Sequence, residues 1–187
     1  MKTVMLLVLG TICGLALAMF PTVAAHLHVV RSAIHGANGV VGSTRAHTEE
    51  KFSFTARAAI DRVAALFGAD KERVWAPKWN PQFIHPSPAA DVRGMVFTIA
   101  HHHLQAVWVN TEFDLANGRV QYVYVIPEIM LTMITIKLQP DGAQTKVEVE
   151  YDRTALTPEA DTRLQEMAQQ DRTSGPEWEQ QINQYLQ

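Results

Sequence analysis

The sequence predicts an α+β fold in which one curved antiparallel sheet wraps around a long C-terminal helix, with a space between the two. Three observations carry this prediction. A strand pattern followed by a short helical pattern opens the domain, a run of strand patterns fills its middle, and a polar helical segment closes it after Pro158. This order of elements has few compact solutions, and a sheet that grips the last helix is the natural one.

The opening strand and helix follow from their apolar periods. Phe52, Phe54 and Ala56 alternate with polar residues, which predicts a half-buried strand. Segment 58–68 then carries apolar residues at helical spacing and ends on a glycine that can cap a helix. A second short helical turn is expected just before Pro77.

Strand patterns dominate the middle of the chain. Turn signals at 117–118 (Asn-Gly) and 140–142 (Pro-Asp-Gly) predict antiparallel hairpins between successive strands. After Pro158 the pattern becomes helical and polar, with an interruption at 174–176 (Ser-Gly-Pro) before the last turns. The predicted strands of this region span 92–100, 105–114, 119–126, 129–138 and 145–151.

Hairpin parity predicts which side chains face the last helix. Across the turn at 117–118 one face continues from strand to strand, whether the loop holds two or four residues. The Pro-Asp-Gly turn is expected to close Gln139 onto Ala143. The side chains predicted to face inward are Val107, Val109, Thr111, Phe113, Val120, Tyr122, Tyr124, Ile126, Leu131, Met133, Thr135, Val147, Val149 and Tyr151.

The opposite face of segment 129–138 is also apolar, through Met130, Ile134, Ile136 and Leu138. A sheet with one face in water does not explain two apolar faces. Three explanations stay open: a contact within a homodimer, a covering segment, or a different strand register.

The N-terminus has the pattern of a targeting element. Lys2 supplies a positive charge, residues 4–20 are uncharged, and small residues follow before His26. A full membrane span needs about 20 apolar residues, so a signal peptide over 1–25 is favoured over a membrane anchor. The protein is then secreted or periplasmic, whereas with an anchor it is attached to the membrane through residues 4–20. Residues 26–50 read as a flexible connector, and the domain is placed at 51–187.

Composition excludes several classes of protein. With 187 residues, 47% of them hydrophobic, the chain fits one folded domain. A formal net charge of −3, with both signs scattered, lacks the basic stripe that nucleic-acid binding calls for. The only cysteine, Cys13, lies in the uncharged run, so the rest of the chain has no thiolate for a metal or for catalysis. No cofactor, no resident metal and no nucleic acid are expected.

Several short motifs carry a family resemblance over residues 51–187. They are 52–56 (FSFTA), 74–81 (VWAPKWNP), 94–98 (GMVFT), 108–109 (WV), 154–157 (TALT), Trp178 and 185–186 (YL). With them the chain resembles the SRPBCC superfamily, the START-like or helix-grip proteins that include polyketide cyclases and lipid carriers. The motifs are specific for this fold and weak for function.

The resemblance implies a hydrophobic pocket between sheet and last helix, for a lipid, a polyketide-like aromatic or another apolar molecule. In this fold the segment after the first helices lies near the pocket mouth. Trp75 and Trp79 therefore either contact the ligand or fill the core where the sheet bends. The residues expected to contact a ligand are Trp75, Trp79, His85, Val109, Thr111, Phe113, Tyr122, Tyr124, Met133 and Tyr151.

The predicted strand faces do not bring titratable side chains together at one site. Neighbouring strand residues point to opposite faces, so within 101–103 (His-His-His) only the first and third could share a metal, and a solvated turn is favoured. The same parity places Trp108, Glu112 and Asp114 on the outward face, and Arg153 is expected at the surface. No carboxylate is expected to face the pocket.

Three functions stay open. Binding of an apolar small molecule or lipid needs only the pocket, and it is favoured. A cyclase- or dehydratase-like enzyme would bury a titratable side chain with a shifted pKa inside the pocket. A structural domain would fill the cavity with its own large inward side chains, and the volume of the cavity discriminates it from the other two.

Overall fold

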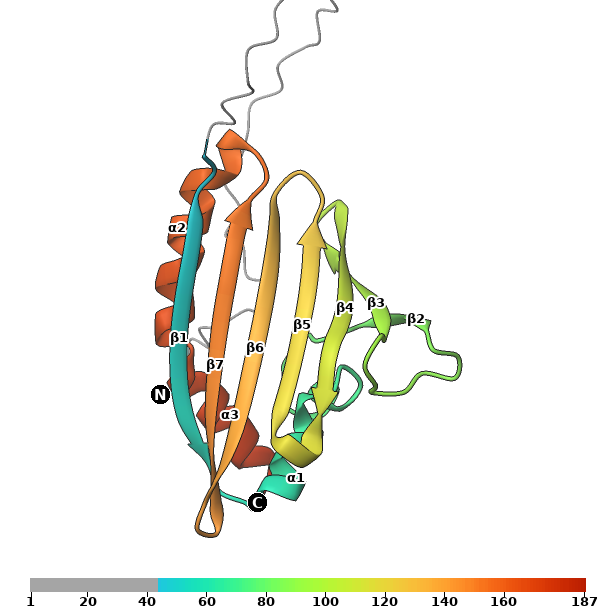
Figure 1. The fold of residues 1–187 in the computed structure, drawn as a ribbon, viewed down its shortest axis with the longest axis vertical. Coiled ribbons are helices and arrows are strands. Elements are labelled where there is room, and N and C mark those ends of the chain that lie inside the picture. Colours follow the sequence, from blue (N-terminus) through green and yellow to red (C-terminus); the bar gives the residue numbers. More distant parts are fainter. Residues whose placement is uncertain (1–43) are drawn as a thin grey trace, which may run out of the picture.

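The computed structural model describes residues 44–187. Seven antiparallel strands form one sheet in the order β1-β7-β6-β5-β4-β3-β2, and helices α2 and α3 lie on one face of it (Figure 1). The strands are β1 (His47–Ala56), β2 (Gln82–His85), β3 (Val96–His101), β4 (Leu104–Asp114), β5 (Arg119–Ile126), β6 (Met130–Asp141) and β7 (Gln144–Ala155). The helices are α1 (Ile60–Ala64), α2 (Pro158–Thr173) and α3 (Gly175–Tyr185), with 3₁₀ helices η1 (Ala65–Phe67), η2 (Lys71–Val74) and η3 (Leu115–Asn117). The predicted α+β architecture is confirmed.

Strands β1 and β2 differ from the prediction. Strand β1 begins at His47, ahead of Lys51. The short strand β2 lies inside segment 73–86 (RVWAPKWNPQFIHP), which we call the Trp/Pro loop. Strand β2 pairs with β3 at the edge of the sheet, where prolines next to a strand break no ladder on its free side. The signal peptide or anchor at 1–25 and the connector up to residue 43 lie outside the described residues. Within 44–187, no helix is long and apolar enough to cross a membrane.

The C-terminal helical segment is divided in two, as its sequence predicts. Helix α2 ends at Thr173, and α3 begins at Gly175 with Pro176 in its first turn. A side chain at position 175 would come within 3.3 Å of the Ser53 carbonyl oxygen of β1. Glycine therefore allows the start of α3 to pack closely against the edge strand.

The register of β6 differs from the predicted one and resolves the problem of two apolar faces. The turn between β6 and β7 pairs Asp141 with Gln144, and Gly142 adopts a left-handed φ of 62°. The loop therefore holds two residues, not three. Because side chains alternate with a period of two, this change reverses every β6 side chain. Met130, Ile134, Ile136 and Leu138 form the buried face, while Leu131, Met133 and Thr135 face outward; the predicted inward placement of these last three is wrong.

A β-bulge in β4 reverses the face of one half of that strand. Phe113 pairs with Val120 and faces inward as predicted, but between Glu112 and Asn110 the register shifts by one residue. Ala106, Trp108 and Asn110 are consequently buried beside Tyr122 and Tyr124. The predicted inward placement of Val107, Val109 and Thr111 is wrong, and so is the outward placement of Trp108.

A buried ion pair fixes α2 to the sheet. Arg153 of β7 is 2% exposed and donates two hydrogen bonds, each 2.9 Å long, to the Asp171 carboxylate of α2. Its guanidinium also donates to the hydroxyls of Tyr124 at 2.6 Å and Thr132 at 3.1 Å. The prediction that Arg153 is a surface charge is wrong, because β7 continues to Ala155 and its alternation carries position 153 to the inner face.

Candidate functional site

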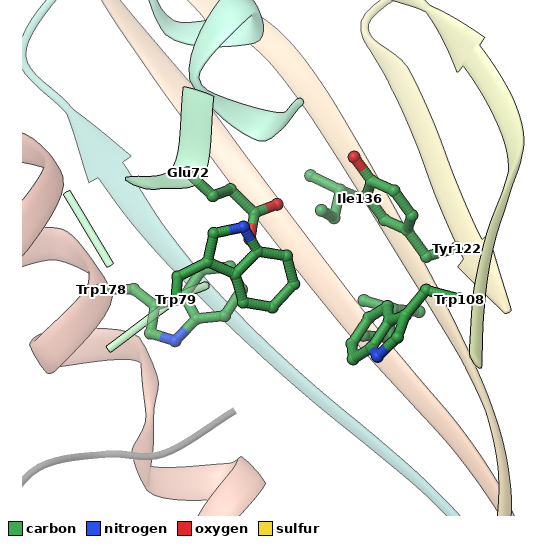
Figure 2. A pocket seen from close by; sticks show the side chains of 7 residues that line it. Glu72, Trp79, Trp108, Tyr122, Ile136 and Trp178 are labelled. Carbon is green, nitrogen blue, oxygen red and sulfur yellow. The ribbon is translucent and has the colours of Figure 1, made fainter. Parts of the chain in front are cut away.

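A small cavity lies between the inner face of the sheet, η2, the Trp/Pro loop and α3 (Figure 2). Its volume is about 10 Å³, close to the minimum that holds one water molecule. The lining is mostly aromatic and aliphatic, with one carboxyl group. The seven lining residues are Glu72, Trp79, Trp108, Tyr122, Ile134, Ile136 and Trp178.

Three aromatic side chains around the cavity donate hydrogen bonds to backbone carbonyls that follow α1, and these bonds fix their positions. The Trp75 indole N–H donates to Leu66 O at 2.7 Å, and the Trp79 indole N–H donates to Ala69 O at 2.6 Å. The Tyr122 hydroxyl donates to Phe67 O at 2.8 Å. Carbonyls at the end of a helical segment have no intrahelical partner. These side chains satisfy them, which explains why a loop rich in proline carries two tryptophans.

Trp79 separates the cavity from solvent. It is the one partly exposed residue among the seven that line the cavity, since the other six are buried. Its ring packs edge-on against Trp108, with centroids 5.4 Å apart, and against Phe97, with centroids 6.0 Å apart. An outward movement of this single side chain would open the cavity on the loop side.

The carboxyl group in the lining belongs to Glu72, which sequence reasoning missed. Its side chain comes from η2, is 4% exposed and makes no hydrogen bond within residues 44–187. Burial raises the pKa of Glu72 well above its usual value, and the neighbouring charge of Asp91 raises it further. The expectation that no carboxylate faces the pocket is wrong. The signal was present, because residues three apart lie on one side of a 3₁₀ helix and Trp75 follows Glu72 at that spacing.

On the inner face of β4, two further buried polar groups lack a hydrogen-bond partner in the described part of the chain. They are the indole N–H of Trp108 and both polar atoms of the Asn110 side chain amide. Each such group usually needs an explanation, because losing water without gaining a protein partner costs about 1–3 kcal/mol. The sequence could not identify either residue, since the β-bulge in β4 decides their face.

Besides Trp79, five of the residues predicted to contact a ligand lie on the inner side of the domain, and one of these five lines the cavity. Tyr122 lines it, whereas Trp75, Tyr124, Tyr151 and Phe113 pack in or against the surrounding core. Tyr124 accepts a hydrogen bond from Arg153, and the Arg153 guanidinium lies 4.4 Å from the centre of the Tyr151 ring. These two tyrosines therefore belong to the buried ion-pair network.

Four predicted ligand contacts lie away from the cavity. Val109, Thr111 and Met133 are on the outer face of the sheet, for the reasons of register given above. His85 ends the edge strand β2 and is exposed. The inner positions on these strands are taken by residues of the opposite parity.

The three consecutive histidines do not form a common site. His101 is 4% exposed and ends β3 on the inner face, while His102 and His103 are exposed in the turn. The Arg163 guanidinium of α2 lies 3.2 Å from His101 Nε2. Burial, followed by the charge of Arg163, lowers the pKa of His101 to about 4. His101 is therefore a neutral buried residue at neutral pH.

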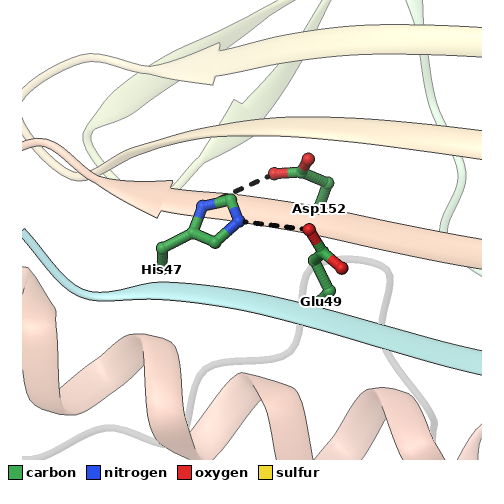
Figure 3. A group of neighbouring side chains, drawn as sticks. All are labelled: His47, Glu49 and Asp152. Atoms are coloured by element: carbon green, nitrogen blue, oxygen red, sulfur yellow. Dashed lines mark ion pairs between the residues drawn. The ribbon is translucent and has the colours of Figure 1, made fainter.

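A group of titratable side chains also occurs on the outer face of β1 and β7. His47 lies 3.6 Å from a Glu49 carboxylate oxygen and 3.7 Å from an Asp152 oxygen (Figure 3). His47 Nδ1 lies 3.0 Å from the Thr154 hydroxyl. His47 and Glu49 are exposed, so solvated ion pairs account for this arrangement.

A larger hollow of about 530 Å³ lies beside α3 and is open to solvent. Its walls are polar, with Arg57, Glu179 and Asn183 among the lining residues. Asn183 is already used structurally, because its side chain bridges Arg57 N and Thr55 O across the end of β1. We therefore place the candidate site at the aromatic cavity.

Comparison with solved structures supports the fold. Norcoclaurine synthase from Thalictrum flavum superposes with a TM-score of 0.59 at 11% identity, covering 86% of this chain and 98% of that one. A protein from Thermobifida fusca gives 0.54 at 16% identity, covering 73% and 92%. Ara h 8.0201 gives 0.53 at 13% identity, covering 75% and 97%. No family model matches the sequence, and no curated protein matches it.

At these identities the likeness establishes the fold and nothing finer. The chain has the helix-grip fold, as its motifs predict. Within that fold this protein places a small hydrophobic cavity between the sheet and α3.

Proposed function

We propose that the domain binds a small, largely apolar molecule in the aromatic cavity, and that Trp79 moves outward to admit it. One observation carries the proposal: among the residues that line the cavity, six are buried and Trp79 alone is partly exposed. Trp79 also lies on a loop between η2 and β2, where a change of backbone conformation disturbs no interior strand of the sheet.

The size of the ligand follows from the size of this side chain. In the closed state the cavity has room for about one water molecule. Removing the Trp79 ring from its place against Trp108 and Phe97 would leave a space of about the volume of an indole. We therefore expect the ligand to be a compound with one ring or two fused rings, or a larger lipid of which one end enters the cavity.

Native mass spectrometry of the full-length protein, purified from its own host, tests this proposal. We expect a species heavier than the chain by one defined small-molecule mass, and denaturing extraction releases that molecule for identification. The matched control is Trp75→Phe, which alters a buried tryptophan that does not line the cavity. Binding that survives Trp75→Phe and changes with Trp79→Phe would support entry past Trp79.

A protein that carries no small molecule and takes none from a host lipid extract would contradict the proposal. The nearly filled cavity would then be a structural core. Tryptophan fluorescence adds a second readout, because a ligand that displaces Trp79 moves its indole into water and shifts its emission to longer wavelength. An unchanged spectrum at saturating ligand would exclude the movement of Trp79.

Catalysis is a second candidate, and Glu72 is the observation that favours it. A buried carboxyl with a raised pKa inside a hydrophobic cavity is the type of group that gives or takes a proton at neutral pH. A cyclase- or dehydratase-like reaction would lose its rate in Glu72→Gln while substrate binding stays. Equal turnover of any identified ligand by both proteins would exclude this role for Glu72.

We also propose that the protein is exported, because the uncharged segment 4–20 and the small residues after it have the pattern of a signal peptide. N-terminal sequencing of the protein from its host distinguishes the two forms. A start near His26 indicates cleavage and release, and an intact Met1 in the membrane fraction indicates an anchor.

A further inference from the structure

We infer that the molecule bound in this cavity is neutral and presents a hydrogen-bond acceptor, such as the carbonyl of a ketone or quinone, to the Glu72 carboxyl group. This inference rests on the proposed function and specifies its ligand class. It predicts that the protein forms a hydrogen bond to one polar atom of the ligand and makes only apolar contacts with the rest of it.

The position of Glu72 is the first argument. Its side chain comes from η2, is 4% exposed and lines a cavity whose other walls are three tryptophans, two isoleucines and a tyrosine. Figure 2 shows the carboxyl group among these rings. Placing a carboxyl here without a hydrogen bond costs free energy that an aliphatic side chain of similar size would not cost. Packing therefore does not explain the residue, whereas a ligand that pairs with it does.

The charge state of the cavity is the second argument. Burial, followed by the repulsion of Asp91, raises the pKa of Glu72 and so favours the protonated carboxyl, which is a hydrogen-bond donor. Tyr122 and Tyr151, which also lie near Glu72, are themselves kept neutral, because burial raises the pKa of each. A second donor without a partner, the Trp108 indole N–H, belongs to another residue of the lining. Donors of this kind match a carbonyl oxygen.

The lack of a cation in the lining is the third argument. None of the seven lining residues is basic. The buried guanidinium of Arg153 already binds Asp171, Tyr124 and Thr132. A carboxylate ligand would bring a negative charge into a low-dielectric space without a compensating partner, at a cost of several kcal/mol. Ionised fatty acids are thus disfavoured relative to neutral carbonyl compounds.

The test uses the full chain with Trp79→Ala, which leaves a space of about the size of an indole, and three probes with the same bicyclic skeleton. Indane has no polar atom, 1-indanone adds a carbonyl, and 1-indanecarboxylate adds an ionised group. Isothermal titration at pH 7 gives the dissociation constant of each. The 1-indanone carbonyl loses its bound water when it enters the cavity, and this cost is the same in every variant. We therefore compare the ratio of the indane and 1-indanone dissociation constants between proteins with and without Glu72.

With Glu72→Leu in the same background, we expect this ratio to fall by about three- to tenfold, the effect of one hydrogen bond. Glu72→Gln keeps a donor and should hold the ratio within about twofold of the parent. The carboxylate should bind more weakly than 1-indanone to the parent. A ratio that Glu72→Leu leaves unchanged, or a carboxylate that binds as tightly as the ketone, would overturn the inference.

The remaining outcomes separate this inference from the proposed function. Selective binding of 1-indanone by the Trp79→Ala protein, together with no ligand taken up by the unaltered chain, would uphold the recognition chemistry and contradict the opening of the cavity. Folded Trp79→Ala protein that binds none of the probes would overturn both, and would leave a water molecule as the partner of Glu72. Trp79→Leu replaces Trp79→Ala if the smaller side chain prevents folding.

Discussion

Arg153 and Asp171 form a two-pronged ion pair in the interior, with Nε to Oδ2 and Nη2 to Oδ1 both at 2.9 Å. Their side chains are 2% and 10% exposed. Arg153 lies on β7 and Asp171 on α2, so this contact holds the helix against the sheet that it covers. The hydroxyls of Tyr124 and Thr132 accept the remaining guanidinium hydrogen bonds. The network is well satisfied, which is the condition under which a buried pair is tolerated.

Removing one partner of this pair should be strongly destabilising. We expect Arg153→Met to lower the free energy of unfolding by about 3–5 kcal/mol, because the Asp171 carboxylate would stay buried without a countercharge. Urea unfolding followed by circular dichroism measures this change. The double variant Arg153→Met/Asp171→Leu should recover much of the loss, since it leaves no uncompensated charge.

The exposed pair Lys51–Glu150 provides the control for that experiment. Its atoms are 3.2 Å apart, but the side chains are 55% and 24% exposed. Glu150→Gln should therefore change the free energy of unfolding by less than about 1 kcal/mol. A loss in Arg153→Met no larger than in Glu150→Gln would show that the buried pair contributes no more than a surface pair.

Glu72 should make stability depend on pH in a defined direction. Because the native pKa is raised above 4.5, the folded protein keeps a proton that the unfolded chain has already released. The contribution of this group is present in full below pH 4.5 and is lost as pH rises toward the native pKa. The slope is at most about 1.4 kcal/mol per pH unit for one proton.

The comparison with Glu72→Gln isolates this effect, since the amide does not titrate. The difference in free energy of unfolding between the two proteins should move in favour of Glu72→Gln as pH increases from 4 to 8. Asp91 also has a raised pKa, chiefly through burial, and its contribution largely cancels in the difference. A difference that stays constant over this range would mean that Glu72 ionises normally in the native state.

Two glycines with the same left-handed φ of 62° should respond differently to alanine. At Gly118 an added Cβ would lie 2.3 Å from the Leu138 carbonyl oxygen, whereas at Gly142 it would meet nothing within 4 Å. Gly142→Ala should cost about 1 kcal/mol, the strain of the left-handed conformation alone. We expect Gly118→Ala to cost at least about 2 kcal/mol more, as a backbone clash requires a shift of the strand. Thermal unfolding of the two variants under one set of conditions measures the difference, and equal losses would contradict the clash.

His101 should titrate far below an ordinary histidine. Burial, then the positive charge of Arg163, lowers its pKa from 6.5 to about 4, which two-dimensional NMR of the imidazole resonances can follow. The stability that depends on neutral His101 is present above pH 6.5 and is lost as pH falls through about 4. Arg163→Gln should raise the pKa of His101 but leave the effect of burial. A midpoint near 6.5 in the unaltered protein would show that the ring is exposed to water in solution.

The order of strands and helices in this domain follows from its sequence alone. Alternation in 52–56, the turn signals at 117–118 and 140–142, and the helical pattern after Pro158 are local properties, set by backbone period and turn conformation. They suffice to predict a sheet gripping two consecutive helical segments. The motifs around Trp75 and Trp79 add the resemblance to helix-grip proteins and indicate that the Trp/Pro loop reaches the core.

Which face each strand presents depends on the tertiary structure. One residue fewer in the β6–β7 loop reversed Met133, and one extra residue in the β4 bulge exchanged Thr111 and Val109 for Trp108 and Asn110. Since side chains on a strand alternate strictly, a register error of one residue moves a whole row of side chains to the other face. The local sequence contains little information about the register. The burial of Glu72 was decided in the same way, by the packing of a short 3₁₀ helix over the sheet.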